Sequence, residues 1–339
     1  MHVSFAPLEG ITTSTYRKVF RRYFGGIDLF YTPFLAANHN HKFRHREKNE
    51  YLPCDDVLVP QVLTSSSDDF LWAAGVLHDA GYYTVNLNAG CPSSTVITKH
   101  KGAGMLADKE RFDEFLYSVF DGVSRVTDVS DAKDSANDSL DSFSVDSART
   151  QPSADKLSIS IKTRIGAVSH EEVDKLIKIW SKYPISELII HPRAGSDLYN
   201  GTPDMDAFRA VHDAFKASDT LITYNGELRT AADVDELMNA FPDLDRIMIG
   251  RGLLINPSLA DEIRGGNHFT HDMLDAFLDD LWKEYEAVLS GPRDILFKMK
   301  ELWFWLGLSF PNKADEIKEI RKTNSADDYK HAVKNILRT

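Results

Sequence analysis

The stretch TVNLNAGCP, residues 84–92, carries a short run of β-branched and apolar residues directly into a turn that contains Asn88, Gly90 and Cys91. Short apolar runs bounded by Gly, Pro or Asn are typical of strands that are buried on both faces. The same pattern recurs along the chain. It predicts eight strands, at residues 2–7, 27–31, 57–62, 84–88, 158–163, 187–191, 220–224 and 246–250.

Amphipathic segments separate the predicted strands. One covers residues 171–182, where apolar side chains recur at helical spacing, and another covers residues 231–240. Eight strands, each followed by a helical segment, predict an α/β fold that closes into a (β/α)8 TIM barrel. An open doubly wound sheet is the alternative. Its dinucleotide-binding version is disfavoured, because no G-x-G-x-x-G follows the first strand.

The chain is long enough for a barrel and a second, smaller domain. It has 339 residues, whereas a (β/α)8 barrel takes about 250. From about residue 268 the alternation gives way to helical patterns, at residues 273–289 and 293–308 and on both sides of Asn324. We therefore expect a catalytic barrel at residues 1–265 and an all-helical domain at residues 266–339.

Residues 127–156 interrupt the barrel pattern. Fourteen of these thirty residues are Asp or Ser. Such a composition cannot bury enough apolar surface to offset the entropy that is lost on ordering. We expect a flexible surface insertion between the fourth helix and the fifth strand.

The net charge of −12 argues against a protein that binds nucleic acid without specificity, because phosphate contacts need Lys and Arg. The acidity is unevenly distributed. Residues 127–156 hold seven acidic and three basic residues, a balance of −4, whereas residues 293–339 hold seven acidic and ten basic residues, a balance of +3. A mildly basic helical region thus follows an acidic barrel.

Cysteine usage and hydropathy indicate the compartment. The two cysteines, Cys54 and Cys91, are too few for a disulfide framework, which favours a reducing environment. No apolar run approaches the roughly 18 to 20 residues that span a bilayer, and the N-terminus lacks the residue order of a signal peptide. We expect a cytoplasmic protein without a membrane segment.

Polar and reactive residues follow the predicted strands. In a barrel, the carboxyl ends of the strands and the loops after them form the active site, so we expect these residues at one rim. They are residues 7–10, Gln61, residues 86–92, residues 162–164, residues 191–193, residues 225–227 and residues 250–252.

Two of these groups predict a phosphate site. Asn225-Gly226 and Gly250-Arg251-Gly252 follow the last two strands, where barrels commonly bind phosphate through backbone N–H groups. For Asn-Gly alone, the alternative is a tight turn.

Two further strand-end residues carry reactive groups. Lys162 is the last inward residue of a buried strand, where an unpaired ammonium is costly. Lys162 suits an anionic partner such as the N1/O2 edge of a reduced flavin, and a buried ion pair with Asp or Glu is the alternative.

Cys91 can donate a proton, act as a nucleophile or bind metal. We expect no metal, because no other Cys or His lies at ligand spacing. Cys54, by contrast, fits an inert small hydrophobic residue.

Several motifs, in the correct order, resemble those of bacterial tRNA-dihydrouridine synthases (the Dus family). The most specific is LNAGCPS at residues 87–93, followed by GAGML at residues 102–106. The others are APLEG at 6–10, IKTRIG at 161–166, IIHPR at 189–193, YNGEL at 224–228 and MIGRG at 248–252. The resemblance extends from the first strand to about Pro257. The helical region fits the family's tRNA-binding domain more loosely.

The resemblance implies an FMN enzyme that reduces the C5–C6 double bond of specific tRNA uridines with electrons from NADPH. Cys91 would be the general acid that protonates C5, since hydride addition at C6 places negative charge on C5 and O4. The target base has to leave its stack to reach the barrel mouth. The implied flavin contacts are Pro7, Leu8, Glu9, Gln61, Lys162, His191, Asn225, Gly226, Glu227, Gly250 and Arg251.

A second set of residues is assigned to the tRNA substrate: Asn88, Arg164, Lys99, Lys101, Arg293, Lys298 and Lys300. The lysines and Arg293 would form a basic track, and a solvated face is the alternative.

Two other functions stay open. One is an FMN-dependent TIM-barrel oxidoreductase that acts on a small molecule, and the other is a non-catalytic tRNA-binding protein. The sequence does not indicate the uridine position, a preference for NADPH over NADH, or the oligomeric state.

Overall fold

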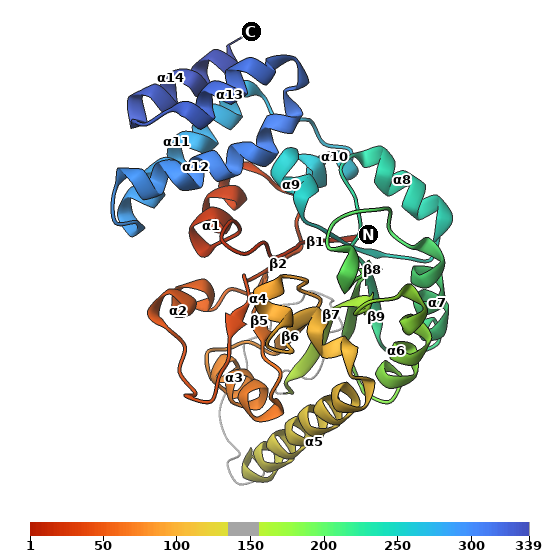
Figure 1. Cartoon of the computed structure of the whole chain (residues 1–339). Helices are drawn as coiled ribbons and strands as arrows, with labels where there is room; N and C mark the ends of the chain where they lie inside the picture. Colours follow the sequence, from red (N-terminus) through yellow and green to blue (C-terminus); the bar gives the residue numbers. More distant parts are fainter. Residues whose placement is uncertain (135–155, 339) are drawn as a thin grey trace, which may run out of the picture. The chain divides into compact units, whose positions relative to one another are not determined.

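The structure, a computed structural model, describes residues 1–134 and 156–338 (Figure 1). All eight predicted strands are confirmed. The third is divided in two by Pro60, which has no N–H group to donate to a neighbouring strand. A tenth, two-residue strand at residues 35–36 was not predicted. The strands are β1 His2–Phe5, β2 Leu29–Tyr31, β3 Leu35–Ala36, β4 Leu58–Val59, β5 Gln61–Leu63, β6 Thr84–Ala89, β7 Ser158–Gly166, β8 Glu187–Ala194, β9 Leu221–Tyr224 and β10 Arg246–Ile249.

The chain forms two compact units, and one of them contains Cys91. This Cys91 unit comprises residues 34–48 and 52–222. Its strands pair in the order β3-β5-β6-β7-β8. The pairs are parallel, and their register places Asn88 opposite Lys162 and Arg164 opposite His191. The carboxyl ends of β6, β7 and β8 therefore carry the predicted site residues at one edge of this part of the sheet.

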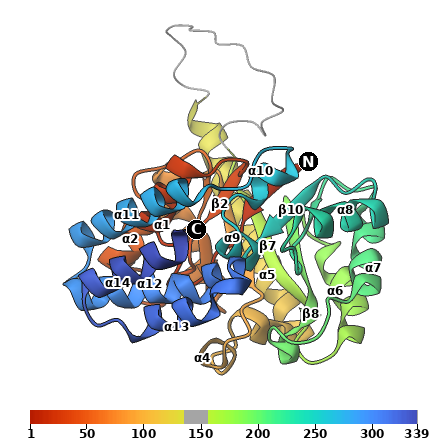
Figure 2. The ribbon, with the colours of Figure 1, turned by 90° about the horizontal axis from the view of Figure 1, so that it is seen from above.

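Helices alternate with the strands of the Cys91 unit (Figures 1 and 2). The predicted helix at residues 171–182 is confirmed, and its buried face is formed by Val173, Leu176, Ile179 and Trp180. Two short elements, residues 94–97 and 102–107, follow β6; the second packs on β6, and the first packs on the second. The elements are α2 His45–Tyr51, α3 Ser67–Asp79, α4 Ser94–Ile97, η1 Gly102–Ala107, α5 Lys109–Asp134, η2 His170–Glu172, α6 Val173–Trp180, η3 Gly195–Asp197 and α7 Met205–Phe215.

The other unit contains Arg251 and comprises residues 1–33, 49–51 and 223–339. In this Arg251 unit the parallel strands pair in the order β9-β10-β1-β2. The predicted helix at residues 231–240 is confirmed. The helices of the barrel part are α1 Ser14–Tyr23, α8 Ala231–Ala240, α9 Arg251–Ile255 and α10 Leu259–Ile263.

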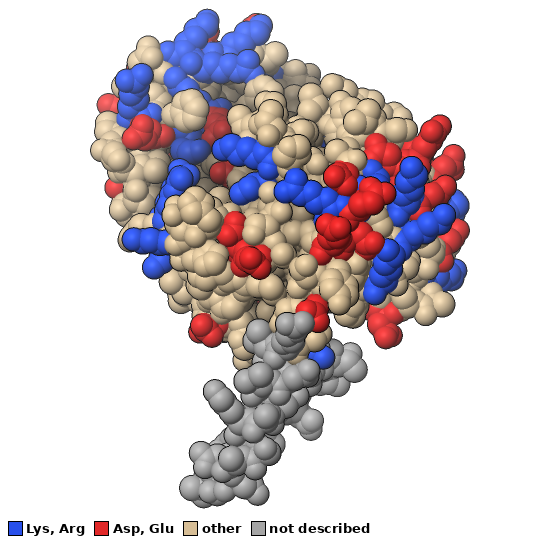
Figure 3. All heavy atoms as spheres, turned by 60° about the horizontal axis from the view of Figure 1, so that its bottom comes forward, with Lys and Arg blue, Asp and Glu red and all other residues tan. Residues whose placement is uncertain are grey.

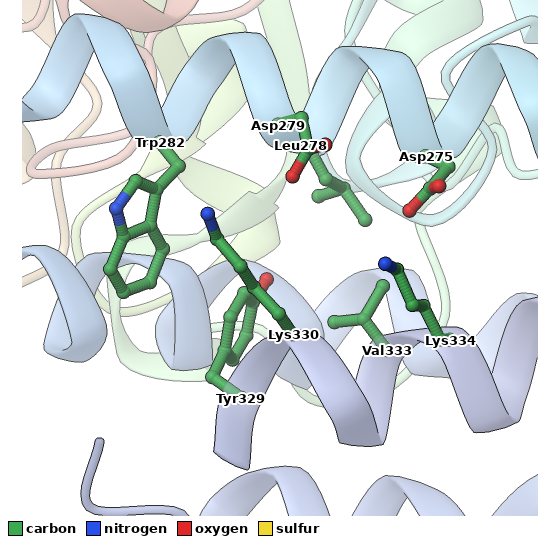
Figure 4. A pocket seen from close by; sticks show the side chains of 8 residues that line it. All are labelled: Asp275, Leu278, Asp279, Trp282, Tyr329, Lys330, Val333 and Lys334. Atoms are coloured by element: carbon green, nitrogen blue, oxygen red, sulfur yellow. The ribbon is translucent and has the colours of Figure 1, made fainter. Parts of the chain in front are cut away.

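The predicted helical region is confirmed as well, and it belongs to the Arg251 unit. Its elements are α11 His271–Val288, α12 Pro292–Leu306, η4 Gly307–Ser309, η5 Pro311–Lys313, α13 Ala314–Lys322 and α14 Ala326–Leu337. The Phe277 ring on α11 packs against Tyr16 and Tyr23 of α1, with ring centroids 5.9 Å apart in both pairs. Between α11 and α14, Trp282 stacks on Tyr329 at 5.4 Å, and the Lys330 ammonium lies 5.7 Å from the Trp282 ring (Figure 4).

Parallel strands that alternate with helices, followed by an all-helical region, confirm the predicted fold class. The predicted domain boundary between residues 265 and 266 stays a prediction. Helix α5 continues to Asp134, through the first residues of the stretch 127–156, and residues 135–155 lie outside the described residues. In residues 1–134 and 156–338, no helix combines the length and the apolar composition that crossing a bilayer requires.

Candidate active site

The turn that carries Cys91 is held by the side chain of the strand before it. Asn88 lies in β6, and its Oδ1 atom accepts hydrogen bonds from the backbone N–H groups of Gly90 and Cys91, at 3.1 and 2.9 Å. The Cys91 thiol is in the reduced form and partly buried. Gly102 packs against this turn with φ +57°, and a Cβ atom there would lie 2.6 Å from the Cys91 carbonyl oxygen. Only glycine fits this position.

A buried chain of amides and a hydroxyl orients Asn88. The Asn88 amide nitrogen donates to Gln61 Oε1 at 2.7 Å, and the Gln61 amide nitrogen donates to Asn86 Oδ1 at 2.8 Å. Asn86 in turn donates to the Ser160 hydroxyl at 2.8 Å. Gln61, Asn86 and Ser160 are completely buried. The structure thus links two predicted site residues, Gln61 and Asn88, to the backbone of Cys91, because buried polar groups require partners.

Lys162 places an ammonium group at the end of β7. Burial, followed by the positive charge of Arg164, lowers the pKa of Lys162 from its usual 10.5 to about 7, and the nearby Cys91 opposes this shift. Within the described residues, no carboxylate forms an ion pair with Lys162. The alternative of a buried ion pair therefore finds no partner there. A buried ammonium of this kind favours an anionic ligand.

Arg164 connects the Cys91 turn to the loop after β8. Its side chain is 1% exposed. Its Nε donates to the Gly90 carbonyl at 3.0 Å, its Nη1 donates to the Ala194 carbonyl at 2.7 Å, and its Nη2 donates to the Leu198 carbonyl. Burial lowers the pKa of Arg164 to about 10. Its guanidinium group is therefore a fixed structural cation, charged at neutral pH, that joins the Cys91 turn to the loop after β8.

The loop after β8 contributes a residue that sequence reasoning missed. Tyr199 is 56% exposed, the Arg164 guanidinium lies 5.5 Å from its ring, and the ring of His191 lies 6.4 Å away. Arg193 contacts the ring nitrogen Nε2 of His191 at 3.0 Å. An aromatic residue shortly after the IIHPR motif was the available signal in the sequence. An exposed ring beside a buried cation is suited to stacking on a base.

In the Arg251 unit, the loop after β1 carries Leu8 and Glu9. Leu8 is partly buried and its N–H group donates to the Thr12 hydroxyl at 2.8 Å, whereas Glu9 is exposed. Pro7, before them, is partly buried. Gly10 follows with φ +77°, a conformation that favours glycine. The predicted flavin contacts of this loop thus lie on a tight turn.

The predicted phosphate-binding residues occupy two further loops of the Arg251 unit. Asn225 donates to the Met248 carbonyl at 2.7 Å, which ties the loop after β9 to β10. Glu227 accepts from Arg251 at 2.8 and 2.9 Å. Gly226 has no room for a side chain, because a Cβ atom would lie 1.9 Å from the Tyr224 hydroxyl.

Glu227 and Arg251 were both predicted to contact the flavin, and the structure gives them different positions. Arg251 follows Gly250, the residue before α9, and Glu227 orients its guanidinium. Glu227 also accepts from Arg229 at 2.7 Å, so one carboxylate faces two arginines. An oriented guanidinium of this kind is suited to binding a phosphate.

The predicted tRNA contacts differ in their availability. Lys99 is exposed, whereas Lys101 is partly buried and donates to the Ala37 carbonyl at 3.3 Å. Lys298 donates to the Gly10 carbonyl at 2.7 Å and pairs with Glu301 at 3.0 Å. Lys300 donates to the Thr323 carbonyl. The last two lysines therefore already have partners in the protein.

Arg293 at the start of α12 is exposed. Elsewhere on the surface, the face in Figure 3 shows groups of Lys and Arg beside groups of Asp and Glu, with neutral residues between them. Positive charge is thus arranged locally rather than over a whole face. In the part of the chain that the structure describes, no group of three or more His, Cys, Asp or Glu residues is arranged to hold a metal ion.

In the Cys91 unit, a reduced thiol, a buried ammonium and the Arg164 guanidinium lie at the carboxyl ends of parallel strands of an α/β fold. The chain matches the model of the Dihydrouridine synthase (Dus) family over residues 4–130 and 148–328. It therefore belongs to the dihydrouridine synthase family, and it is an oxidoreductase.

Relatives with related names span most of the chain. A protein of Staphylococcus epidermidis named "Probable tRNA-dihydrouridine synthase" is 25% identical, over 79% of this chain and 73% of the relative. A protein of Pseudomonas putida named "tRNA-dihydrouridine(16) synthase" is 24% identical, over 95% of this chain and 93% of the relative. Among solved structures, morphinone reductase aligns with a TM-score of 0.50 at 12% identity, over 79% of this chain and 86% of that chain. This last likeness concerns the fold alone.

Proposed function

We propose that this protein reduces the C5–C6 double bond of a uridine in tRNA, with FMN as its cofactor and NADPH as the reductant, and that Cys91 supplies the proton to C5. The observation that carries this proposal is the Cys91 turn, in which Asn88 and Arg164 bind the peptide group between Gly90 and Cys91, and the reduced Cys91 thiol interacts electrostatically with Lys162. Membership of the Dus family and the names of the relatives support the substrate.

The cofactor proposal rests on the chemistry of Lys162. FMN, when bound and reduced, supplies the hydride that adds to C6 of the uracil. Lys162 would hold the anionic N1/O2 edge of the ring. Its pKa is about 7, so the side chain is only partly protonated at neutral pH, and a bound anion would raise this pKa and keep the ammonium charged. Gln61, Pro7, Leu8, Glu9 and His191 are proposed as further contacts to the ring and ribityl chain.

The phosphate of FMN is proposed to bind Asn225, Gly226, Gly250 and Arg251. The guanidinium that Glu227 orients is suited to an anion. Glu227 would act here by positioning Arg251.

Proton transfer requires a donor fixed at C5 of the base. Negative charge builds on C5 and O4 when hydride adds at C6, so the reaction needs an acid at this place. The turn that carries the Cys91 thiol is fixed by hydrogen bonds between its backbone and the side chains of Asn88 and Arg164. Tyr199 would stack on the base that has left the tRNA helix, and Asn88 and Arg164 would keep the Cys91 turn in place.

The helical domain, residues 266–339, is proposed to bind the tRNA. On α12, Phe297 and Phe304 are 66% and 54% exposed. The Lys298 ammonium lies 6.0 Å from the Phe297 ring, and the Arg321 guanidinium lies 5.7 Å from the Phe304 ring. Exposed aromatic rings that are flanked by cations suit single-stranded bases. Lys99 of the Cys91 unit and Arg293 of α12, whose side chains are exposed, are proposed as phosphate contacts.

The test is dihydrouridine formation on unmodified tRNA with NADPH, measured by nucleoside mass spectrometry. Cys91→Ala is expected to lower the rate by about 10² to 10⁴, the usual contribution of a general acid, while NADPH oxidation by oxygen continues. Cys54→Ala, at the exposed cysteine, is the matched control and is expected to act as wild type.

Three other outcomes would contradict the proposal. Equal rates for the two variants would remove Cys91 from the mechanism. NADPH oxidation without dihydrouridine would favour a small-molecule flavoenzyme. No turnover together with tRNA binding would favour a non-catalytic binding protein. If product forms, position 16 is the first site to map, because it stands in the name of the Pseudomonas putida relative.

A further inference from the structure

His170 contacts two carboxylates with its two ring nitrogens. It lies in η2, after β7, and its Nε2 atom is 2.7 Å from Asp197 Oδ2, while its Nδ1 atom is 2.7 Å from Asp204 Oδ2. An ionised carboxylate can only accept hydrogen bonds. Both ring nitrogens therefore donate, which requires the doubly protonated, positively charged imidazolium.

The two carboxylates mark the ends of a single loop in the Cys91 unit. Asp197 closes η3 directly after β8, where it also accepts from the Ala194 N–H at 2.7 Å. Asp204 precedes α7 and caps its first turn through the Ala207 N–H at 2.9 Å. His170 thus bridges residue 197 to residue 204 and fixes the ends of the loop between them.

That loop contains the groups that contact the proposed catalytic residues. The Leu198 carbonyl accepts from Arg164, which also donates to Gly90 in the Cys91 turn. Leu198 has φ +54°, a conformation that costs energy for a residue with a β carbon. Tyr199 follows, beside Arg164 and His191. A strained loop of this kind needs contacts at its ends to stay in one conformation.

We propose that His170 is a positioning residue for uridine reduction: its imidazolium clips Asp197 to Asp204 and so holds Tyr199 and Arg164 in the arrangement that supports the Cys91 turn. The inference rests on the function proposed above. It predicts that turnover depends on a proton that takes no part in the chemical step.

The charged groups around the clip come from five elements. Asp197 lies on η3, Asp204 precedes α7, Glu171 and Glu172 lie beside His170 on η2, and Arg164 of β7 acts on Asp197. Glu172 is engaged by Lys109 of α5. Partial burial lowers the pKa of His170, but the hydrogen bonds to Asp197 and Asp204 outweigh it, so the pKa lies above its usual value.

The direction of the pH dependence follows from this raised pKa. The clip is fully formed below the pKa of an unfolded histidine, about 6.5. It is lost as the pH rises through the higher pKa of the folded protein. Alkaline conditions are therefore expected to release the loop.

Two variants test the clip in the flavin-loaded protein. His170→Gln keeps a polar group but cannot donate to both carboxylates as a cation. His170→Arg carries a charge that does not titrate and a fork of donors that can reach two carboxylates. His268→Gln, at an exposed histidine that contacts the single carboxylate of Glu262 at 2.6 Å, is the control.

The first measurement is hydrogen exchange of residues 195–204, expressed as protection factors, across about pH 5 to 9. This range covers the usual titration of histidine, about pH 5 to 8, and the higher pKa of His170. We expect protection to fall with pH in the wild type, to be low throughout in His170→Gln and to be high throughout in His170→Arg. The second is kcat for dihydrouridine formation at saturating tRNA. We expect a loss of about tenfold to a hundredfold in His170→Gln, the scale of a misplaced reacting group. His170→Arg should restore the rate and remove the alkaline decline.

The two readouts separate failure of the clip from failure of the proposed function. Equal protection in wild type and His170→Gln would overturn the clip. Altered protection with unchanged kcat and an unchanged pH profile would overturn the positioning role. A wild-type protein whose loop responds to pH but which forms no dihydrouridine would overturn the proposed function, and with it the role of His170 in that reaction.

Discussion

Replacing Lys162 by methionine is expected to stabilise the flavin-free protein at pH 7 while it weakens flavin binding. The pKa of Lys162 is lowered from 10.5 to about 7, chiefly by burial. The protein therefore tolerates a costly ammonium at this position. Methionine retains the length and flexibility of the side chain without the charge, and replacing a buried charge by an apolar group of similar size often stabilises a protein.

The expected magnitude follows from the shifted pKa. Each pKa unit corresponds to about 1.36 kcal/mol. At pH 7 half of the folded molecules carry the proton at Lys162, which gives a ceiling of about 4 kcal/mol for the destabilisation. The side chain is only partly inaccessible to solvent, so water relieves part of this cost, and we expect a gain of about 2 kcal/mol in the free energy of unfolding.

The sign of the pH dependence is specific to this case. Because the folded pKa lies below the unfolded pKa, the unfolded chain binds more protons between about pH 7 and 10.5. Wild-type stability from this group rises with pH across that range. The advantage of Lys162→Met should therefore be largest near pH 7 and shrink towards pH 10.

Urea denaturation of flavin-free wild type, Lys162→Met and Lys175→Met at pH 7, 8.5 and 10 measures the effect. Lys175 is an exposed lysine on α6, and its substitution is expected to change stability little at any pH. A Lys162→Met protein that is less stable than wild type at pH 7, or whose advantage does not shrink as the pH rises, would refute the reasoning. Retention of FMN by the same variants then tests the proposed contact.

Three further predictions concern the Cys91 turn, an acidic cap and the helical surface. Asn88→Ala removes the acceptor for the Cys91 N–H. It should lower the free energy of unfolding by about 1–3 kcal/mol, as an unsatisfied buried group does, and should also lower the rate of dihydrouridine formation. Asn88→Asp keeps the acceptor and should retain more of the stability and more of the activity. The pKa of Glu172 is about 2, because hydrogen bonds from Lys109 and the backbone outweigh partial burial. The carboxylate therefore stabilises the fold above about pH 4.5, and this stabilisation is lost as the pH falls towards 2. In a pH series, the melting temperature of Glu172→Gln should fall less steeply below about pH 4.5 than that of the wild type. Combined Phe297→Leu and Phe304→Leu should weaken tRNA binding by about 1–3 kcal/mol per stacked base in a filter-binding assay, whereas the corresponding Trp variants should not, and equal affinity for the Leu and Trp variants would exclude stacking.

Local pattern was sufficient to locate the eight predicted strands and the helices at residues 171–182 and 231–240. Strand β6 and helix α8 were predicted within a residue of their bounds, because apolar periodicity and turn residues are properties of neighbouring positions. Pro60 shows the limit of this reasoning. Its missing N–H group divides one predicted strand into two, which a simple count of apolar residues does not reveal.

The candidate site was predictable as a list of residues and unpredictable as a network. The sequence indicates that Gln61, Asn88 and Cys91 follow strand ends. It does not indicate that the Asn88 amide nitrogen donates a hydrogen bond to Gln61, or that the Asn88 amide oxygen accepts one from the Cys91 N–H. Likewise, the basic residues Lys298 and Lys300 are visible in the sequence, but their bonds to backbone carbonyls of Gly10 and Thr323 are not.

By itself, the sequence determined the alternation of strands and helices, the helical region and the set of reactive strand-end residues. These follow from periodicity and residue type, which act over a few positions along the chain. The tertiary structure decided which of those groups have partners. Asp197 and Asp204 lie 27 and 34 residues from His170 in the chain. The fold brings both carboxylates into contact with the His170 ring, and these two contacts require the charged imidazolium. Hydrogen bonds and burial depend on which distant residues are brought into contact, and only the folded chain specifies this.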